Sequence, residues 1–289
     1  MTVLQTGPIG AAVTCEVAFR AILEQCCEAF EAQLARIHAE DDPSGPHKCR
    51  VALRRFLTAV DAFSPLLRRK ATHRLRARAL RIFRSLGPLR DSDVQIADWP
   101  DAPDQARRIK ENIRLRDEIR RRLGKRDARQ FAAEVRRVLE EGALFRNRKA
   151  ARRLRRAPLG DFAAGALGAA WERCLSHGPS VLWMSPTERH ALRKDLKSMR
   201  YLAEFIAPVL PDLVPTALYA ALCELQDALG ALNDFQLARR LMGKVKPKPP
   251  LPPQIAAILA AADTQWGQMA RTDQPWGKVA EASTPRVQA

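Results

Sequence analysis

The sequence predicts an all-α protein built from two copies of one helical unit, and three observations lead to this fold class. Alanine, leucine and arginine dominate the composition and aromatic residues make up only 6%, which favours helices over sheets. Apolar residues recur at three- and four-residue spacing, for example from Phe19 to Ile37. The chain also aligns with itself at an offset of 143 residues without a gap. Such self-similarity is the signature of a repeated structural unit.

The two copies align around residues 43–64 and 186–207, which match in chemistry position by position. The alignment pairs His47 with His190, Arg50 with Arg193, Arg54 with Lys197, Asp61 with Glu204, Gly87 with Gly230 and Asp91 with Asp234. One register kept over about fifty residues is hard to obtain by chance. We therefore predict two pseudo-symmetric repeats, each resembling a four-helix bundle.

Each repeat carries a cationic stripe on the helix that contains its histidine. On a helical wheel the stripes consist of His47, Arg50 and Arg54 in the first repeat and of His190, Arg193, Lys197 and Arg200 in the second. A charged helix face is most often simply solvated. These residues, however, recur in both repeats and lie beside the apolar stripe rather than opposite to it. We therefore expect them to line a groove, where charge of one sign gathers an oppositely charged ligand.

Four segments of the chain together resemble the CHAD family of histidine-containing α-helical domains. They read HKCRVALRRF from residue 47, LGPLRDSDV from residue 86, RHALRKDLKSMRYLAEF from residue 189 and LQDALGALND from residue 225. With the connecting helices, the resemblance covers about residues 13–245. It implies two helical bundles around a basic central channel, binding of inorganic polyphosphate and association with polyphosphate granules.

The resemblance also implies which residues contact the ligand. The matching basic positions are His47, Arg50, Arg54, Arg55, His190, Arg193, Lys194, Lys197 and Arg200. One position departs from the family pattern, because Leu57 stands where a basic residue is expected. The first site is therefore expected either to bind less tightly or to be compensated by the following helix.

The remaining elements of the first repeat can be placed in order. Residues 1–12 are expected to be irregular, followed by a helix over 13–39, a loop at 41–46 and a helix over about 72–86. The last of these helices carries a second cationic stripe, formed by Arg74, Arg78 and Arg81. Its counterpart at 215–229 is much less basic, so the two repeats are electrostatically unequal.

In each repeat, an aspartate follows the glycine that the self-alignment pairs with its counterpart in the other repeat. We expect Gly87 and Gly230 to stop helices, with Asp91 or Ser92, and Asp234, capping the helices that follow. A metal site formed by Asp91, Asp93 and Asp234 is the weaker alternative, because no His or Cys lies at ligand spacing. We therefore expect no metal or cofactor, and we expect the carboxylates to hold the basic side chains in place.

The segment 104–156 carries most of the net charge, with 20 Lys and Arg against 8 Asp and Glu, a net of +12. Helices are expected at about 104–123 and 126–141, within a first repeat that spans residues 13–157. Two interpretations stay open for this segment. It is either a solubilising, solvent-facing helix pair or an accessory surface that binds a polyanion.

The second repeat is expected to span residues 158–243. Its helices are predicted at 161–175, 186–207, 212–230 and 235–243, and the one at 186 has Ser185, Pro186 and Glu188 as starting signals. A proline-rich spacer follows at 244–253. Residues 254–289 are expected to form one short helix to about residue 269 and then a disordered tail.

Composition limits the environment and the partner. The net charge is +17 and the isoelectric point is about 10.4, which predicts an anionic partner. The six cysteines form no C-x-x-C pair and are expected to be reduced, mostly buried thiols of a cytoplasmic protein. No membrane span is expected, and no basic residue precedes Arg20, so we expect no signal peptide.

Three functions compete on this sequence. The first is non-catalytic binding of polyphosphate through the Arg, Lys and His stripes, which includes a prediction of tighter binding at mildly acidic pH. The alternative is nonspecific nucleic-acid binding through the basic 104–156 helices, although Tyr201 is the one aromatic candidate for base stacking beside the stripes. An enzyme is not expected, because a phosphate-binding glycine-rich loop and metal-holding carboxylates are missing from the sequence.

Overall fold

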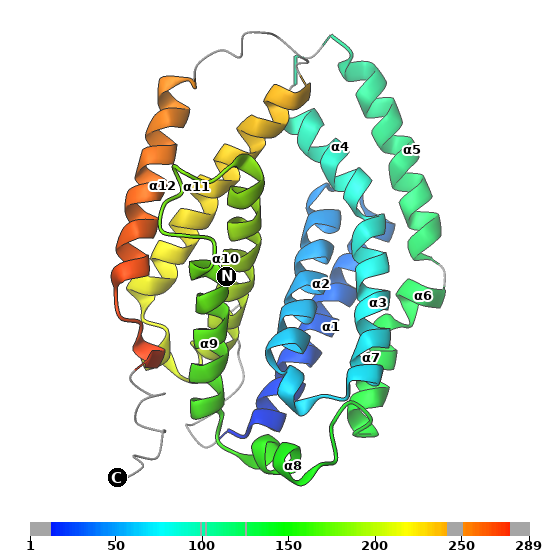
Figure 1. Cartoon of the computed structure of the whole chain (residues 1–289). Helices are drawn as coiled ribbons and strands as arrows, with labels where there is room; N and C mark the ends of the chain where they lie inside the picture. Colours follow the sequence, from blue (N-terminus) through cyan, green and yellow to red (C-terminus); the bar gives the residue numbers. More distant parts are fainter. Residues whose placement is uncertain (1–12, 99, 102, 125, 242–250, 278–289) are drawn as a thin grey trace. The chain divides into compact units, whose positions relative to one another are not determined.

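The computed structural model describes residues 13–98, 100–101, 103–124, 126–241 and 251–277, and every regular element within them is helical. The structure also contains isolated β-bridges, one of which joins Leu67 and Phe145. The predicted all-α fold class is therefore confirmed. The chain divides into two compact units, coloured by sequence in Figure 1. The N-terminal unit is Thr14–Ala157, and the C-terminal unit starts at Pro158 and includes residue 13.

The N-terminal unit contains eight described α-helices and one 3-10 turn. They are α1 (Cys15–Ala39), α2 (Ser44–Ala62), η1 (Ser64–Leu66), α3 (Arg69–Ser85), α4 (Gly87–Asp98), α5 (Gln105–Leu123), α6 (Arg126–Arg129), α7 (Phe131–Glu140) and α8 (Lys149–Arg156). Its core includes a cluster of rings in which Phe131 lies 5.4 Å from Phe30 and 5.2 Å from Phe56 between centroids. Because these rings come from α7, α1 and α2, the cluster holds α7 against the α1–α2 pair.

The C-terminal unit is built from α9 (Leu159–Leu175), α10 (Pro186–Ile206), η2 (Pro211–Leu213), α11 (Thr216–Leu241) and α12 (Pro253–Arg271). The predicted helix after the proline-rich spacer is α12, and it packs against α11. Trp171 of α9 lies 5.5 Å from Trp266 of α12 and 6.2 Å from Trp276 between ring centroids. The structure differs from the expected disordered tail at residues 272–277, since Trp276 is buried against this cluster.

The predicted helix stop is confirmed at Gly87 and wrong at Gly230. Helix α3 ends at Ser85 and α4 starts at Gly87, whereas α11 runs through Gly230 without a break and replaces the two helices predicted at 212–230 and 235–243. Asp91 and Asp234 therefore lie inside helices and do not cap them. The physical reason is a close approach: a Cβ atom would lie 3.2 Å from Arg50 at Gly87 and 3.3 Å from Arg193 at Gly230. Glycine makes room there for an arginine side chain.

Two predicted segments lie outside the described residues. The irregular N-terminus at 1–12 is one, and most of the proline-rich spacer at 244–253 is the other, of which residues 251–253 are described. No helix among the described residues combines the length and the apolar character needed to cross a membrane.

Many arginines of the basic 104–156 segment are bound to partners inside the N-terminal unit. Arg136 holds Glu24 and Glu31 of α1 at 2.7 and 2.8 Å, which raises the pKa of the guanidinium. Arg120 donates to the carbonyl oxygens of Ile37 and Glu40 at the end of α1, both at 2.8 Å. A large share of the charge in this segment therefore stabilises helix ends and helix contacts rather than forming a free surface.

The cysteines give the first testable prediction. Five are buried and form no disulfide, namely Cys15, Cys26, Cys27, Cys49 and Cys174, and burial raises the pKa of Cys26, Cys27, Cys49 and Cys174 to about 12. Cys223 is the partly exposed one. A thiol reagent at pH 7.5 should therefore label Cys223 first in the folded protein and all six cysteines in urea, as mass spectrometry of the peptides would show. Fast labelling of Cys26 or Cys49 without denaturant would contradict this packing.

Candidate anion-binding site

Helix α10 presents the cationic stripe of the C-terminal unit. Ser185 accepts from the backbone N–H of Glu188, whose carboxylate accepts from Ser185 in turn, and Pro186 occupies the first turn, as predicted. The adjoining side of α10 is buried through Leu192, Leu196, Met199, Ala203 and Ile206. With one side buried and the start fixed by this capping box, the positions of the basic residues along the helix are set.

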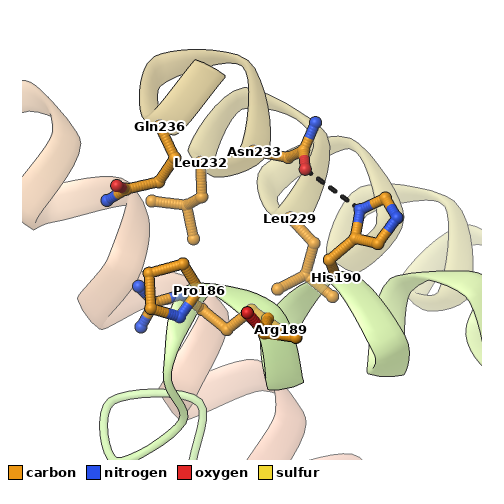
Figure 2. Close-up of a pocket in the computed structure, with 8 residues that line it drawn as sticks. Pro186, Arg189, His190, Leu229, Leu232, Asn233 and Gln236 are labelled. Carbon is orange, nitrogen blue, oxygen red and sulfur yellow. Dashed lines mark hydrogen bonds between the residues drawn. The ribbon is translucent and has the colours of Figure 1, made fainter. Parts of the chain in front are cut away.

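A pocket of about 240 Å³ lies between α10 and α11 (Figure 2). It is lined by Pro186, Thr187, Arg189, His190, Leu229, Leu232, Asn233 and Gln236. His190 Nδ1 lies 3.0 Å from Asn233 Oδ1. Because the amide oxygen can only accept, Nδ1 carries the proton in this bond, and a protonated ring would donate a second hydrogen bond from Nε2. His190 is exposed, so that second bond can be made to a ligand.

Arg193 lies one turn after His190 and packs over Gly230. A Cβ at Gly230 would lie 3.3 Å from Arg193 Nη2 and 3.6 Å from Nε. Arg193 Nε is buried and has no hydrogen-bond partner, and no carboxylate of the described residues pairs with this guanidinium. A buried N–H group without an acceptor costs about 1–3 kcal/mol. Arg193 is half-buried as a whole, so part of its side chain remains open to a ligand oxygen.

The other basic residues of α10 differ in availability. Lys194 is exposed and Lys197 is half-buried. Arg200 is held inside the protein: Nε donates to Gln226 Oε1 at 3.0 Å, and Nη1 pairs with Glu204. We expected Arg200 to be a main ligand contact, but its side chain is only 17% exposed and its donors are occupied, so it serves the contact between α10 and α11.

In the N-terminal unit, Arg50 takes the place equivalent to Arg193 but is satisfied internally. Its Nη1 donates to the carbonyl oxygen of Phe83 at 2.8 Å, and its guanidinium lies 4.0 Å from the Phe83 ring centroid. Burial lowers the pKa of Arg50, which Asp91 opposes and Arg54 reinforces. Arg54 also faces the Phe83 ring, at 5.0 Å. Arg50 therefore anchors α2 to the end of α3.

The remaining predicted residues of α2 differ in their surroundings. His47 is exposed. The charge of Arg55 opposes the rise in the pKa of the Cys26 thiol on α1. Arg50 and Arg54 both face the Phe83 ring, and the charges of Arg54 and Arg90 both help to lower the pKa of Arg50.

The second predicted stripe, on α3, is only partly available. Arg78 pairs with Glu134 of α7 and its side chain is only 12% exposed, so it is a structural residue. Arg74 and Arg81 are exposed. The carboxylate that holds Arg78 lies 56 residues away in sequence, and no local pattern could have indicated it.

At Leu57 the first repeat lacks the partner that Arg200 provides in the second. Asp61 pairs with Arg76 of α3, whereas the equivalent Glu204 accepts from Tyr219 at 2.9 Å as well as pairing with Arg200. Arg76 and Tyr219 are themselves separated by the repeat offset. Arg76 therefore neutralises Asp61, and compensation for Leu57 in ligand binding stays a prediction.

The weaker metal hypothesis finds no support in the described residues, where no three His, Cys, Asp or Glu side chains come together. Asp93 is instead buried and accepts from Asn112 at 2.9 Å and from Arg116 at 2.8 Å. Burial raises the pKa of Asp93, and these two donors oppose the rise. This pair is not the expected clamping of stripe residues by aspartates, because Arg116 belongs to α5 and to neither stripe.

One polar pair was missed by the sequence analysis. His177, which was given no role in a loop, lies 2.7 Å from Asp195 of α10 through its Nε2 atom. Gly178 follows with a φ of 99° and accepts from Trp266 Nε1 at 2.8 Å. Glycine next to a histidine at a helix end was the available signal for a fixed turn.

Each stripe belongs to one of the two units, and the basic central channel stays a prediction. Among known proteins, a family model described as CHAD domain matches residues 21–243. A search of curated sequences returns no match. Two solved structures share the fold. One is the CHAD domain from the plant Ricinus communis, with a TM-score of 0.68, 21% identity, and coverage of 99% of this chain and 97% of that one. The other is PptA from Streptomyces chartreusis, with a TM-score of 0.52, 16% identity, and coverage of 93% and 100%.

Proposed function

This chain belongs to the CHAD domain family, and we propose that it binds inorganic polyphosphate without catalysing a reaction on it. The observation that carries the proposal is Arg193, a half-buried arginine whose buried Nε has no acceptor, placed one turn from the exposed His190. Lys194 and Lys197 continue the positive charge along the same helix. A phosphate chain offers several oxygens at short spacing, and arginine can bind two of them at once.

The same helix argues against nucleic acid as the main ligand. Tyr201, the one aromatic candidate for base stacking beside the stripe, is only 1% exposed. Tyr219 is engaged with Glu204 and Arg200. Single-stranded nucleic acids usually bind through exposed aromatic rings together with positive charge. A polyanion without bases fits a surface that offers charge and N–H donors alone.

We extend the proposal to the cytoplasm and to polyphosphate granules, where a binding protein of this kind would meet long chains. It would be supported by co-localisation of a fluorescent fusion with granules and by loss of that pattern in cells unable to make polyphosphate. An unchanged distribution in such cells would leave the binding proposal standing and remove the granule assignment.

The test of the function is a competition at physiological salt, where nonspecific electrostatic binding is already weakened. Long-chain polyphosphate should displace labelled duplex DNA at a lower concentration of phosphate groups than unlabelled DNA does. Polyphosphate affinity should also fall in His190→Ala, because the variant loses an exposed polar ring one turn from Arg193. Equal competition by DNA would favour the alternative function, nonspecific nucleic-acid binding through the 104–156 helices.

A further inference from the structure

A second group of cations gathers in the N-terminal unit, at the start of α3. An open pocket of about 700 Å³ is lined there by Arg68, Arg69, Arg146, Asn147 and Arg148. A neighbouring pocket of about 490 Å³ is lined by Arg69, Lys70, His73 and Arg74. The two pockets share Arg69, and none of their lining residues is acidic. We call the residues Arg68, Arg69, Arg146 and Arg148 the arginine cluster.

Backbone pairing holds the two sides of this cluster together. The N–H of Arg68 donates to the carbonyl of Leu144 at 2.7 Å, and the N–H of Arg146 donates to that of Leu66 at 2.9 Å. Arg146 Nε also donates to the carbonyl of Leu67 at 2.6 Å. The segment before α3 and the segment before α8 are thus fixed side by side. Four guanidinium groups are brought together by the fold rather than by chance motion of surface chains.

The cluster is uncompensated, unlike most of the basic residues around it. Arg68, Arg69 and Arg148 are exposed and make no ion pair with any described residue. Arg68 and Arg148 are also the N-cap residues of α3 and α8, which have no side-chain cap and no acidic residue in their first turns. Positive side chains at helix starts are unfavourable, because the helix dipole is positive at that end. An anion would relieve both effects.

The fold itself does not require these charges. At the repeat offset, Arg68 and Arg69 correspond to Pro211 and Asp212 in the C-terminal unit. Those residues of the C-terminal unit belong to the 3-10 turn η2, with an acidic residue where the cluster has Arg69, whereas Arg68 and Arg69 cap and start helix α3. The arginine cluster is therefore a feature of one unit and is not repeated in the other.

We propose that the arginine cluster is a second anion site, which binds a short run of phosphate groups such as inorganic triphosphate. Guanidinium groups favour phosphate oxygens through paired hydrogen bonds, and several spaced arginines favour linked phosphates over a single one. The choice of ligand class rests on the proposed function, but the residues are different from those of the α10 stripe. The two claims can therefore fail separately.

The test uses the full chain and inorganic triphosphate as the probe, with binding measured by calorimetry and stability by thermal unfolding. Arg69→Ala/Arg148→Ala should bind triphosphate roughly tenfold more weakly than the wild type. Arg114→Ala/Arg121→Ala, which removes two exposed arginines from α5, should leave that affinity within about twofold. Without ligand, the cluster variant should unfold at the same or a higher temperature, and triphosphate should raise the unfolding temperature of the wild type more than that of the variant.

Equal weakening by both double variants would show that only overall charge matters and would overturn the cluster. Absence of triphosphate binding to the wild type would overturn it as well. If long polyphosphate still binds through α10 in either case, the proposed function stands without this inference. If the cluster variant alone binds triphosphate more weakly, and if changes in the α10 stripe leave the affinity for long-chain polyphosphate unchanged, the inference survives and the proposed function fails.

Discussion

Replacing Arg193, Lys194 and Lys197 together with alanine should weaken binding of long-chain polyphosphate roughly 100-fold at physiological salt. A variant that removes three exposed cations of α5, Lys110→Ala/Arg114→Ala/Arg121→Ala, should weaken it less than about fivefold. Both variants lose three positive charges, so nonspecific attraction falls equally in both. Only a localised site makes them differ. Fluorescence titration at several salt concentrations would measure both affinities.

The reason for expecting a large effect lies in the unsatisfied Arg193. Its buried Nε already carries the cost of desolvation without an acceptor, so a ligand oxygen gains the full hydrogen bond. Arg50, its repeat equivalent, donates instead to Phe83 and faces that ring. Arg50→Ala should therefore cost about 2 kcal/mol of unfolding free energy, whereas Arg193→Ala should cost little or none.

Gly230→Ala gives a further control for the position of Arg193. The added Cβ would stand 3.3 Å from Arg193 Nη2 and force that side chain to shift. The helix itself should be as stable or more stable, because alanine favours helix over glycine by about 1 kcal/mol. Weaker polyphosphate binding with unchanged stability would locate the ligand at Arg193. Equal affinities of the α10 and α5 triple variants would show that the stripe is a structural feature.

The repeat was the most productive prediction from the sequence, because it located residues that make equivalent contacts. Arg50 meets Gly87 and Arg193 meets Gly230, at the same offset that the sequence alignment indicated. The alignment could not show why a glycine stands at each of these two positions. A glycine after a helix usually predicts a stop, whereas a close approach by an arginine is a tertiary contact that local sequence does not contain.

Which basic side chains are paired with carboxylates inside the protein was only partly predictable from the sequence. A helical wheel places Arg78 and Arg200 on basic faces, yet each is bound by a carboxylate, Glu134 for Arg78 and Glu204 for Arg200. Glu204 follows Arg200 by four residues, so that pair could have been predicted from helix spacing. Glu134 belongs to another helix, and its partner depends on how α7 packs. Which cations face a ligand is therefore decided by packing.

The other large effect concerns stability and lies in the pair of Asp93 and Arg116, whose side chains are 3% and 5% exposed. Arg116→Met should lower the free energy of unfolding by about 3–5 kcal/mol, because it leaves a carboxylate buried without its charged partner. The double variant Asp93→Leu/Arg116→Met should recover most of that loss, since apolar side chains of similar size remove the desolvation cost on both sides. Urea unfolding followed by circular dichroism would provide the values.

A matched exposed pair on the same helix provides the control. Arg107 pairs with Asp104 at 2.7 Å, but its side chain is 74% exposed, so Arg107→Met should change stability by less than about 1 kcal/mol.

The loss in Arg116→Met should also depend on pH in a defined direction. Burial raises the pKa of Asp93 above that of an unfolded aspartate, and without Arg116 the rise should be larger. Protonation then favours the folded variant at low pH, and this advantage disappears as the pH rises through the folded pKa. The loss of unfolding free energy in Arg116→Met relative to the wild type should therefore be smaller at pH 5 than at pH 7. A loss that grows on acidification would mean that Asp93 is hydrated in the variant and that α4 and α5 have separated.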